Sequence, residues 1–369
     1  MLWIWLGFIL FVLLVLALDL GVFHRKAHVV RTKEALTWSA VWISLGLAFA
    51  AFVYVAYDHH WLGLGVTPDA VDGRINDGAS ATLKYLTGYV VEKSLSVDNV
   101  FVIAMIFAFL RVPALYQHRV LFWGILGALV LRGAMIGIGA KLIAEFHWVL
   151  YVFGALLIAT AAKMLLAKEG HADLSENMVV RLSRRLFPVT DRFHGEHFVV
   201  RAGAATSGEP ETPDAPPARD DAVERATPGT WMLTPLALSL ILVETTDLIF
   251  AVDSIPAIFA ITADPFLVFT SNVFAILGLR SLYFALAGMI DKFRYLKVSL
   301  AAVLGLVGAK MLAGEWLKGA VGPRINLYVL AVVVGILGAG VLASHFANRR
   351  EARTRQGEKP LLSESGSPV

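Results

Sequence analysis

The stretch "VVEKSLSVDNVFVIAMIFAFL", residues 90–110, is long and apolar enough to cross a bilayer, yet it contains Glu92 and Asp98. About 20 apolar residues suffice for a transmembrane helix. The whole chain has the same character, because 57% of its 369 residues are hydrophobic and only 17% are charged. This composition is typical of a membrane protein with several spans. We therefore predict an all-α polytopic membrane protein.

Nine apolar segments are long enough to be transmembrane helices. They lie at residues 2–22, 36–57, 81–108, 119–141, 147–167, 231–261, 266–289, 295–315 and 325–346. Lys and Arg gather on every second connection, beginning with the one that follows the first segment. The positive-inside rule then predicts an external N-terminus and a cytoplasmic C-terminus. The first segment has no evident cleavage site, and its basic residues follow the apolar run, so it is predicted to remain as a helix.

The predicted spans divide the chain into seven parts. These are two N-terminal helices (1–57), an external loop (58–80), a first three-helix repeat (81–167), a cytoplasmic loop (168–230), a second three-helix repeat (231–315), a last helix (325–346) and a tail (347–369). Within the cytoplasmic loop, residues 203–228 are rich in Pro and acidic residues and are predicted to be a flexible linker. The tail is predicted to be disordered for the same reason. Cysteine is absent, which excludes disulfides and thiolate chemistry.

The acid pair of the opening stretch occurs a second time. In "LVETTDLIFAVDSIPAIFAIT", residues 242–262, a shift of 155 positions places Asp247 on Glu92 and Asp253 on Asp98. The motifs "ILG" and "AKML" then follow in the same order in both halves. Each copy contains three helices, and an odd number makes the second copy enter the membrane from the opposite side. Inverted repeats with polar residues at mid-depth are the architecture of many secondary transporters.

The two acids of a pair do not converge on a straight helix. Six residues advance about 9 Å and turn the side chains about 120° apart. We therefore expect both acidic helices to be interrupted, by Pro256 in the second copy and beside polar residues such as Asn99 in the first. Interruption would bring Asp98 and Asp253 toward each other near the membrane centre. Glu244, one turn before Asp247, adds a fifth carboxylate.

Two readings of the five acids are open: ligands for a cation, or structural partners of the nearby cations Lys93, Arg132 and Arg280. Three cations cannot neutralise five acids, which favours the first reading. The donors are oxygen atoms, which suit Mg²⁺, Ca²⁺ or Mn²⁺. Further candidates for the ion path or its surroundings are Asp19, Asn99, Arg132, Asn272 and Arg280. For Asp19 a structural cap or pair is the favoured interpretation, and for Asn272 an interhelical hydrogen bond is at least as good an interpretation as ligation.

At these residues the sequence resembles the TerC family, and in particular its Alx-type branch. The resemblance is carried by "DLGVFHRKAH" from Asp19, "EKSLSVDNVFV" from Glu92, "FPVTDRFHG" from Phe187 and the long run "VETTDLIFAVDSIPAIFAITADPFLVFTSNVFAILGLRSLYF" from Val243. It implies a bacterial inner-membrane protein related to the lysine-exporter superfamily, associated with tellurite resistance, whose Alx-like members resemble manganese exporters. Carried over by motif, the metal-binding acids are Glu92, Asp98, Glu244, Asp247 and Asp253.

The resulting hypothesis is a transporter that exports Mn²⁺ from the cytoplasm in exchange for protons. Carboxylates lose protons to bind a divalent ion and regain them on its release, so proton antiport needs no further machinery. The chain has no Walker motif. We expect no prosthetic group, no enzymatic activity and no nucleic-acid partner; the partners are Mn²⁺, protons and membrane lipids. The alternative hypothesis is a membrane scaffold or metal-delivery partner for secreted or membrane proteins.

Overall fold

The structure, a computed structural model, describes residues 2–21, 32–166, 178–202, 221–286, 295–313, 316 and 325–358. Each predicted span falls on a helix or helix pair within these residues. The helices are α1 (Leu2–Gly21), α2 (Thr32–Asp58), α3 (Gly78–Phe109), α4 (Ala114–Glu145), α5 (Val149–Leu166), α8 (Pro235–Phe259), α9 (Pro265–Leu277) followed by α10 (Leu279–Leu286), α11 (Leu296–Leu312) and α13 (Ile325–Glu358). In the described part, six spans satisfy length and hydropathy limits for crossing a membrane. The prediction of an all-α polytopic membrane protein is confirmed.

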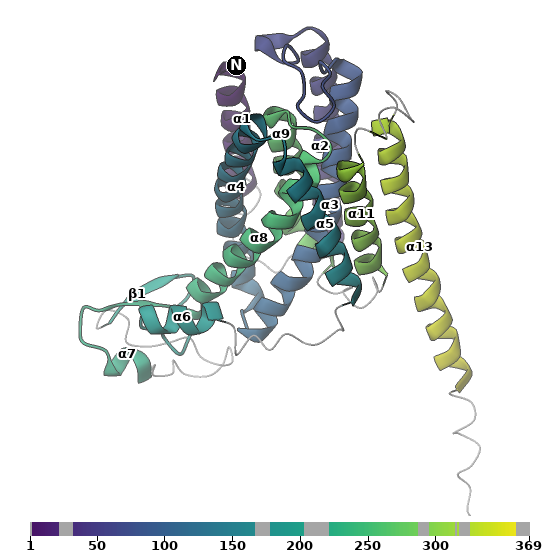
Figure 1. Cartoon of the computed structure of the whole chain (residues 1–369). Helices are drawn as coiled ribbons and strands as arrows, with labels where there is room; N and C mark the ends of the chain where they lie inside the picture. Colours follow the sequence, from purple (N-terminus) through teal and green to yellow (C-terminus); the bar gives the residue numbers. More distant parts are fainter. Residues whose placement is uncertain are drawn as a thin grey trace, which may run out of the picture.

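The bundle has two unlike ends, which we call the loop face and the lobe face (Figure 1). The loop face carries residues 58–77, including the short helix η1 (Trp61–Gly63), and the connection between α8 and α9. The lobe face carries a small lobe, formed by α6 (Met178–Leu186), β1 (Val199–Arg201), α7 (Asp221–Arg225) and β2 (Trp231–Leu233). The two strands pair antiparallel, with Val200 opposite Met232.

The two three-helix repeats pack against each other in an exchanged pattern. The first helix of each repeat packs on the second helix of the other, α3 on α9 and α8 on α4, while the third helices α5 and α11 pack together. In Figure 1, α3 starts at the loop face and α8 starts at the lobe face. A two-fold axis in the membrane plane would relate helices in this way.

Helix starts follow from local sequence. The Asp77 side chain accepts a hydrogen bond from the Ser80 N–H at 2.7 Å and caps α3. Thr234 and Asp264 cap α8 and α9, and each is followed by a proline at the first helical position. The capping residues therefore determine where the first two helices of the second repeat begin.

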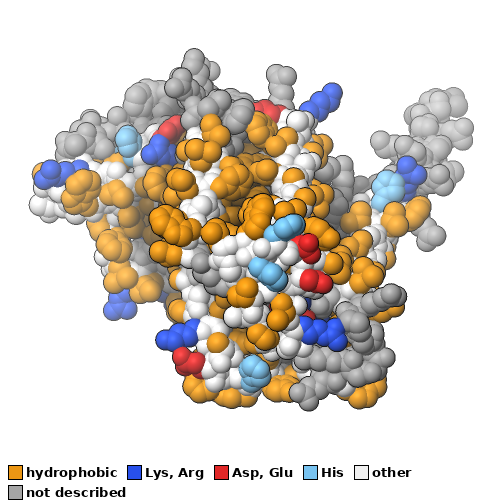
Figure 2. Space-filling model, turned by 90° about the horizontal axis from the view of Figure 1, so that it is seen from above, with side chains coloured by type: hydrophobic (Ala, Val, Ile, Leu, Met, Phe, Trp, Pro, Cys, Tyr) orange, Lys and Arg blue, Asp and Glu red, His pale blue; other side chains and the backbone are white. Residues whose placement is uncertain are grey.

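The largest apolar core joins α1, α2, α3 and α9 through aromatic rings. The rings of Phe49 and Phe274 lie 4.6 Å apart between centroids. Other large apolar side chains point outward, such as Val130 and Ile138 on α4, which are 67% and 68% exposed. Figure 2, seen from above the loop face, shows apolar side chains over much of the surface with scattered charges. The outward-pointing apolar side chains of α4 fit contact with lipid rather than water.

The expected interruption of the acidic helices is not found. Helix α3 runs unbroken from Gly78 to Phe109, and α8 continues through Pro256 to Phe259. The break lies instead between α9 and α10, at Gly278. There the Lys93 ammonium group donates to the carbonyl of Ala275 at 3.0 Å. A cation at the C-terminal end of α9 satisfies an open carbonyl and opposes the helix dipole, which stabilises the break.

Two segments expected to lack structure are ordered in part. Residues 203–220 of the expected linker lie outside the described residues, but Asp221–Arg225 form α7. Val223 of α7 is buried against β1 and β2, and this burial accounts for its order. Helix α13 continues to Glu358, past the expected end at residue 346, because "ANRREARTRQ" is rich in strong helix formers and contains no Pro or Gly. Residues 359–369 lie outside the described residues.

Candidate functional site

Arg132, on α4, lies at the centre of the bundle and joins the first acids of the two repeats. Its Nε and Nη2 atoms donate to the two carboxylate oxygens of Asp247, at 3.1 and 2.8 Å. Its Nη1 atom donates to Glu92 Oε1. The Arg132 and Glu92 side chains are almost wholly buried. The fork geometry towards Asp247 is that of the strongest arginine–carboxylate pairs.

Polar side chains from three other positions complete this centre. Arg132 Nη1 also lies 3.3 Å from Ser254 Oγ and 3.4 Å from Asn272 Oδ1. Asn99 donates from Nδ2 to Asp247 Oδ1 at 3.4 Å. The candidates Asn99, Arg132 and Asn272 are thus brought together with the two acids. The interhelical hydrogen bond that was the alternative for Asn272 is present.

Glu244 occupies a narrow space beside α4. A Cβ atom added to Gly127 would lie 1.9 Å from Glu244 Oε1, so only glycine leaves room for this carboxylate. Glu244 is one helical turn before Asp247, which places both on the face of α8 that packs against α4.

Several oxygen atoms of this centre have no hydrogen-bond partner among the described residues. They are Glu92 Oε2, Asn99 Oδ1 and Glu244 Oε2, and all three are shielded from solvent. A buried acceptor without a donor costs about 1–3 kcal/mol, and more when it is charged. Protons or a hard cation would satisfy such acceptors, since both bind oxygen.

The second acids of the repeats have separate partners. Asp253 accepts a hydrogen bond from Thr160 Oγ1 of α5 at 2.8 Å. Asp98 lies in the field of Lys297 at the start of α11. The unbroken helices explain this separation, because they keep acids six residues apart on different faces. Among the described residues no three His, Cys, Asp or Glu side chains lie close enough to form a metal site.

The two second acids lie at different depths. Asp98 lies about 9 Å beyond Glu92 along α3, towards the lobe face. Asp253 lies about 9 Å beyond Asp247 along α8, towards the loop face. Carboxylates are therefore distributed through the bundle, one towards each face and the others at its centre.

The remaining candidates are not assigned to this centre. Arg280 is buried on α10. The backbone of Asp19 belongs to α1, but its side chain lies outside the described residues.

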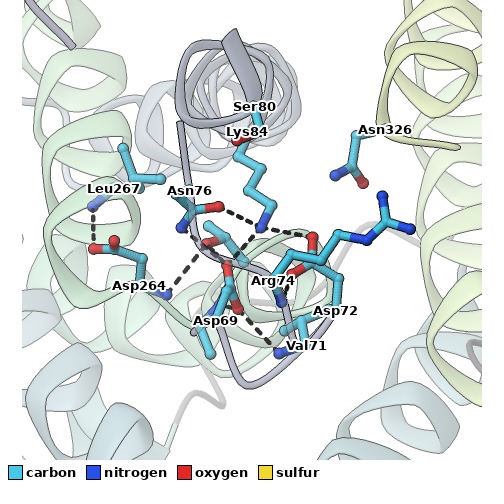
Figure 3. A network of polar contacts seen from close by, with 12 residues as sticks. Asp69, Val71, Asp72, Arg74, Asn76, Ser80, Lys84, Asp264, Leu267 and Asn326 are labelled. Carbon is cyan, nitrogen blue, oxygen red and sulfur yellow. Dashed lines mark hydrogen bonds and ion pairs between the residues drawn. The ribbon is translucent and has the colours of Figure 1, made fainter. Parts of the chain in front are cut away.

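A second buried polar network closes the loop face (Figure 3). The Lys84 ammonium group lies 2.8 Å from Asp69 Oδ2 and 2.8 Å from Asp72 Oδ2, and it donates to Asn76 Oδ1 at 2.6 Å. The Lys84 and Asp69 side chains have no exposed area. These contacts fold residues 69–76 back onto α3.

Asp69 also ties this loop to the connection between α8 and α9. It accepts hydrogen bonds from the hydroxyl of Thr262 and from the N–H of Ala263, the latter at 2.9 Å. Burial raises the pKa of Asp69, but the Lys84 ammonium group and the hydrogen bonds outweigh it, so the net pKa lies below the ordinary value. Asp69 is therefore held as a carboxylate.

Asp264 ends this network on the α9 side. It accepts from Tyr57 at 2.8 Å and caps α9. Burial and the neighbouring Asp69 charge raise the pKa of Asp264, although the hydrogen bond from Tyr57 opposes the shift. Two carboxyl groups with opposite shifts thus share one network.

Comparison with known proteins places the chain in a family. The model of the integral membrane protein TerC family matches residues 77–352. The chain belongs to the TerC family. It is 48% identical over 359 residues to an uncharacterized membrane protein, STKORF319, of Myxococcus xanthus, with 97% of each chain covered.

A second relative carries a functional name. The chain is 43% identical over 357 residues to a protein of Escherichia coli K12 named "Putative membrane-bound redox modulator Alx", with 96% of this chain and 98% of that protein covered. No solved structure matches the chain. The TerC resemblance and its Alx-type branch, predicted from motifs, are confirmed.

The loop-face network is the part of this TerC family protein that sequence reasoning missed. Residues 58–80 were predicted only to form an external loop. The available signal was Lys84, a lysine inside an apolar segment, which needs a partner. Asp69 and Asp72 lie in the loop that precedes α3. This loop folds back so that both carboxylates reach Lys84.

Proposed function

We propose that this protein exports divalent metal cations, most directly Mn²⁺, across the bacterial inner membrane in exchange for protons. The observation that carries the proposal is the set of carboxylates within the bundle on the first helices of the two repeats, with the fully buried Glu92 and oxygen acceptors left without donors at their centre. The N-terminus is external and the C-terminus cytoplasmic in this proposal, so the loop face is external and the lobe face cytoplasmic. Oxygen donors favour Mn²⁺, Mg²⁺ or Ca²⁺ over softer metals.

Charge balance determines how the centre would work. Arg132 contributes one positive charge against the carboxylates of Glu92, Asp247 and the neighbouring Glu244. A divalent cation and Arg132 compete for the same oxygen atoms, because both need the carboxylates ionised. Binding the cation requires Arg132 to release at least one carboxylate, and release of the cation leaves the acids to Arg132 or to protons.

The two second acids supply steps on either side of the centre. In this mechanism Asp98 receives the ion from the lobe face, and Asp253 passes it towards the loop face. The Asp69–Lys84 network covers the exit on the loop side. Opening of residues 58–77 would then alternate with access from the lobe side, as in other carriers built from inverted repeats.

The deciding experiment is Mn²⁺ flux into or out of liposomes containing only the purified protein, with and without a pH gradient. Asp98→Asn and Asp253→Asn keep the side-chain size and one oxygen but remove a charge, so flux should fall by about tenfold or more while folding is retained. Glu145→Gln, at the exposed end of α4, removes a charge outside the path and should leave flux unchanged. Unchanged flux in the well-folded Asp98 and Asp253 variants would exclude the proposed path.

The second candidate is a membrane scaffold or metal-delivery partner, and the name of the Escherichia coli relative adds redox modulation to it. This chain has no cysteine, so it cannot act through thiol–disulfide exchange. A redox effect would follow from a changed concentration of a redox-active metal ion. Liposomes without any partner protein distinguish the two candidates, because only a transporter passes Mn²⁺ there.

A further inference from the structure

A large cavity opens where the bundle meets the lobe. It has a volume of about 880 Å³ and lies between the end of α3 at Phe109, the start of α8 at Pro235 and the segment that follows α6. Three arginines line it, namely Arg111, Arg184 and Arg192, against one acid, Asp191. Such a lining attracts an anion.

Two of these arginines are free to bind an anion. Arg111 and Arg184 make no ion pair with any residue in the described part of the chain, and both side chains are exposed. Arg111 has a positive φ of 52° directly after α3 ends. This backbone conformation turns the chain sharply at the helix end, where Arg111 lines the cavity.

The position of the cavity selects the class of anion. Helix α8 is long and apolar enough to cross a membrane, and α3 packs against it. The cavity lies at the ends of these two helices, where a bilayer would place its headgroups. A phosphate group at this depth would normally belong to a phospholipid. The guanidinium fork binds phosphate through two parallel hydrogen bonds.

Helix α6 has the surface of a helix that lies in a membrane interface. Met178, Leu182 and Leu186 follow each other at four-residue intervals and are 79%, 52% and 64% exposed, whereas Val180 on the other side is buried. Arg181 and Arg185 lie along one side of this apolar stripe. In Figure 1, α6 lies crosswise to the bundle helices. An exposed apolar stripe beside arginines is typical of helices that rest on anionic lipid.

A neighbouring cavity, lined by apolar side chains together with Arg111 and Gln117, offers room for the rest of a lipid. It has a volume of about 550 Å³ and is lined by Ala104, Met105 and Ala108 of α3 and by Tyr283 of α10. Arg111 lines both cavities. A ligand with a phosphate in one cavity and an apolar chain in the other would pass Arg111.

We propose that this junction is a binding site for one anionic phospholipid of the leaflet on the lobe side. Arg111 and Arg184 bind its phosphate, an acyl chain lies along α3 beside Met105, and α6 rests on the surrounding headgroups. The site joins the lobe to the bilayer and is separate from the buried acids of the bundle centre.

Native mass spectrometry of the full-length protein tests this site. The protein is purified in detergent and supplied with an equimolar mixture of phosphatidylglycerol and phosphatidylcholine. Wild-type protein should retain one phosphatidylglycerol with about tenfold preference, and Arg184→Gln should reduce that preference by about tenfold through loss of a charge-assisted contact. Arg184→Lys keeps the charge and should retain part of the preference. Arg181→Gln, on the same helix but outside the cavity, is the matched control.

The outcomes are distinguishable. Equal retention of the two lipids by wild-type protein, or equal losses in Arg184→Gln and Arg181→Gln, would overturn the site, since the latter points to general charge on α6. Excess inorganic phosphate should not displace the bound lipid; displacement would assign the cavity to a soluble anion instead. Arg184 is exposed, so its variants should fold, and gel filtration with circular dichroism verifies this.

Discussion

At the scale of single residues, Arg132 determines what the buried acids do. Without it, Glu92 and Asp247 would face each other across the centre of the bundle as like charges in a medium of low dielectric constant. With Arg132 between them, the two carboxylates and the guanidinium group form an ion cluster whose net charge is negative. The arginine therefore stabilises the fold, and in the proposed transport it defines what a cation would have to displace.

Loss of Arg132 should destabilise the protein. Arg132→Gln leaves two buried carboxylates without their cation, and removing one partner of a buried pair costs about 3–5 kcal/mol. We expect a large drop in folded yield and in thermal midpoint, measured by fluorescence-detected gel filtration after heating. The combined variant Glu92→Gln, Asp247→Asn, Arg132→Gln has no charge to pair, and its stability should recover. A triple variant as unstable as Arg132→Gln alone would mean that Arg132 stabilises the bundle by packing.

Gly127 offers a second test at this scale, directed at Glu244. Gly127→Ala places a methyl group 1.9 Å from Glu244 Oε1, so this carboxylate must move away from α4. The clashing atoms are the end of a flexible side chain, so the carboxylate can swing aside and the fold should be retained. Gly137→Ala on the same helix meets nothing within 4 Å and is the matched control. We expect Mn²⁺ binding, measured by isothermal titration in detergent, to weaken only in Gly127→Ala; equal binding in both variants would show that Glu244 is not part of the site.

At the scale of elements, the sequence predicts which helices exist better than where they break. Apolar length locates every span, and the capping residues Asp77, Thr234 and Asp264 locate three starts. Pro256 is a poor guide to a break, because a proline near the end of α8 is accommodated within the helix. Gly278 breaks the next helix because Lys93, from the other repeat, satisfies the carbonyl that the break exposes. No local pattern in the sequence reveals that contact.

The 58–77 segment is an element whose docking depends on charge, and its response to pH follows from Asp69. The pKa of Asp69 is lowered in the docked state, so its contribution to docking is present above the ordinary value of about 4 and is lost as pH falls through the lowered pKa. Asp264 has a raised pKa and acts oppositely: its burial disfavours docking above that raised pKa and ceases to do so as pH falls through it. Docking should tighten slightly on mild acidification and loosen only below pH of about 4.

A nitroxide label at Val66→Cys would report this docking, because Val66 is half exposed and the chain has no other cysteine. Electron paramagnetic resonance in nanodiscs gives label mobility as a function of pH. Lys84→Met removes the positive partner of Asp69, so the pKa of Asp69 should rise and the label should become mobile at higher pH than in the Lys84 protein. Identical mobility profiles with and without Lys84 would show that this ion pair does not hold the segment.

At the scale of the whole molecule, the sequence reveals the internal repeat and the opposite directions of its helices. It does not reveal which acids of the two copies meet. The shift that aligns Asp247 with Glu92 predicts two helices in opposite directions, and the exchanged packing of α3 on α9 and α8 on α4 agrees with it. Which acids meet depends on helix rotation. The first acids of each pair meet through Arg132, whereas Asp253 accepts a hydrogen bond from Thr160 of α5. Periodicity gives angles within one helix, but it does not give the rotation of one helix against another.

If the molecule works by alternating access, fixing one face should stop transport without touching the acids. Ala70, in the loop, and Ala263, after α8, line the same cavity and pack in the same apolar cluster, while Asp69 binds the N–H of Ala263. A short bifunctional thiol reagent that joins Ala70→Cys to Ala263→Cys would hold the loop face closed. The absence of native cysteine makes the reaction specific to this pair.

Mn²⁺ flux in liposomes should be lost on cross-linking and return on cleavage of the reagent. The single variants Ala70→Cys and Ala263→Cys, treated identically, should keep their flux. The cross-linked protein should still bind Mn²⁺ from the lobe side, because its buried acids are unchanged. Full flux through a completely cross-linked protein would show that the loop face does not open during transport.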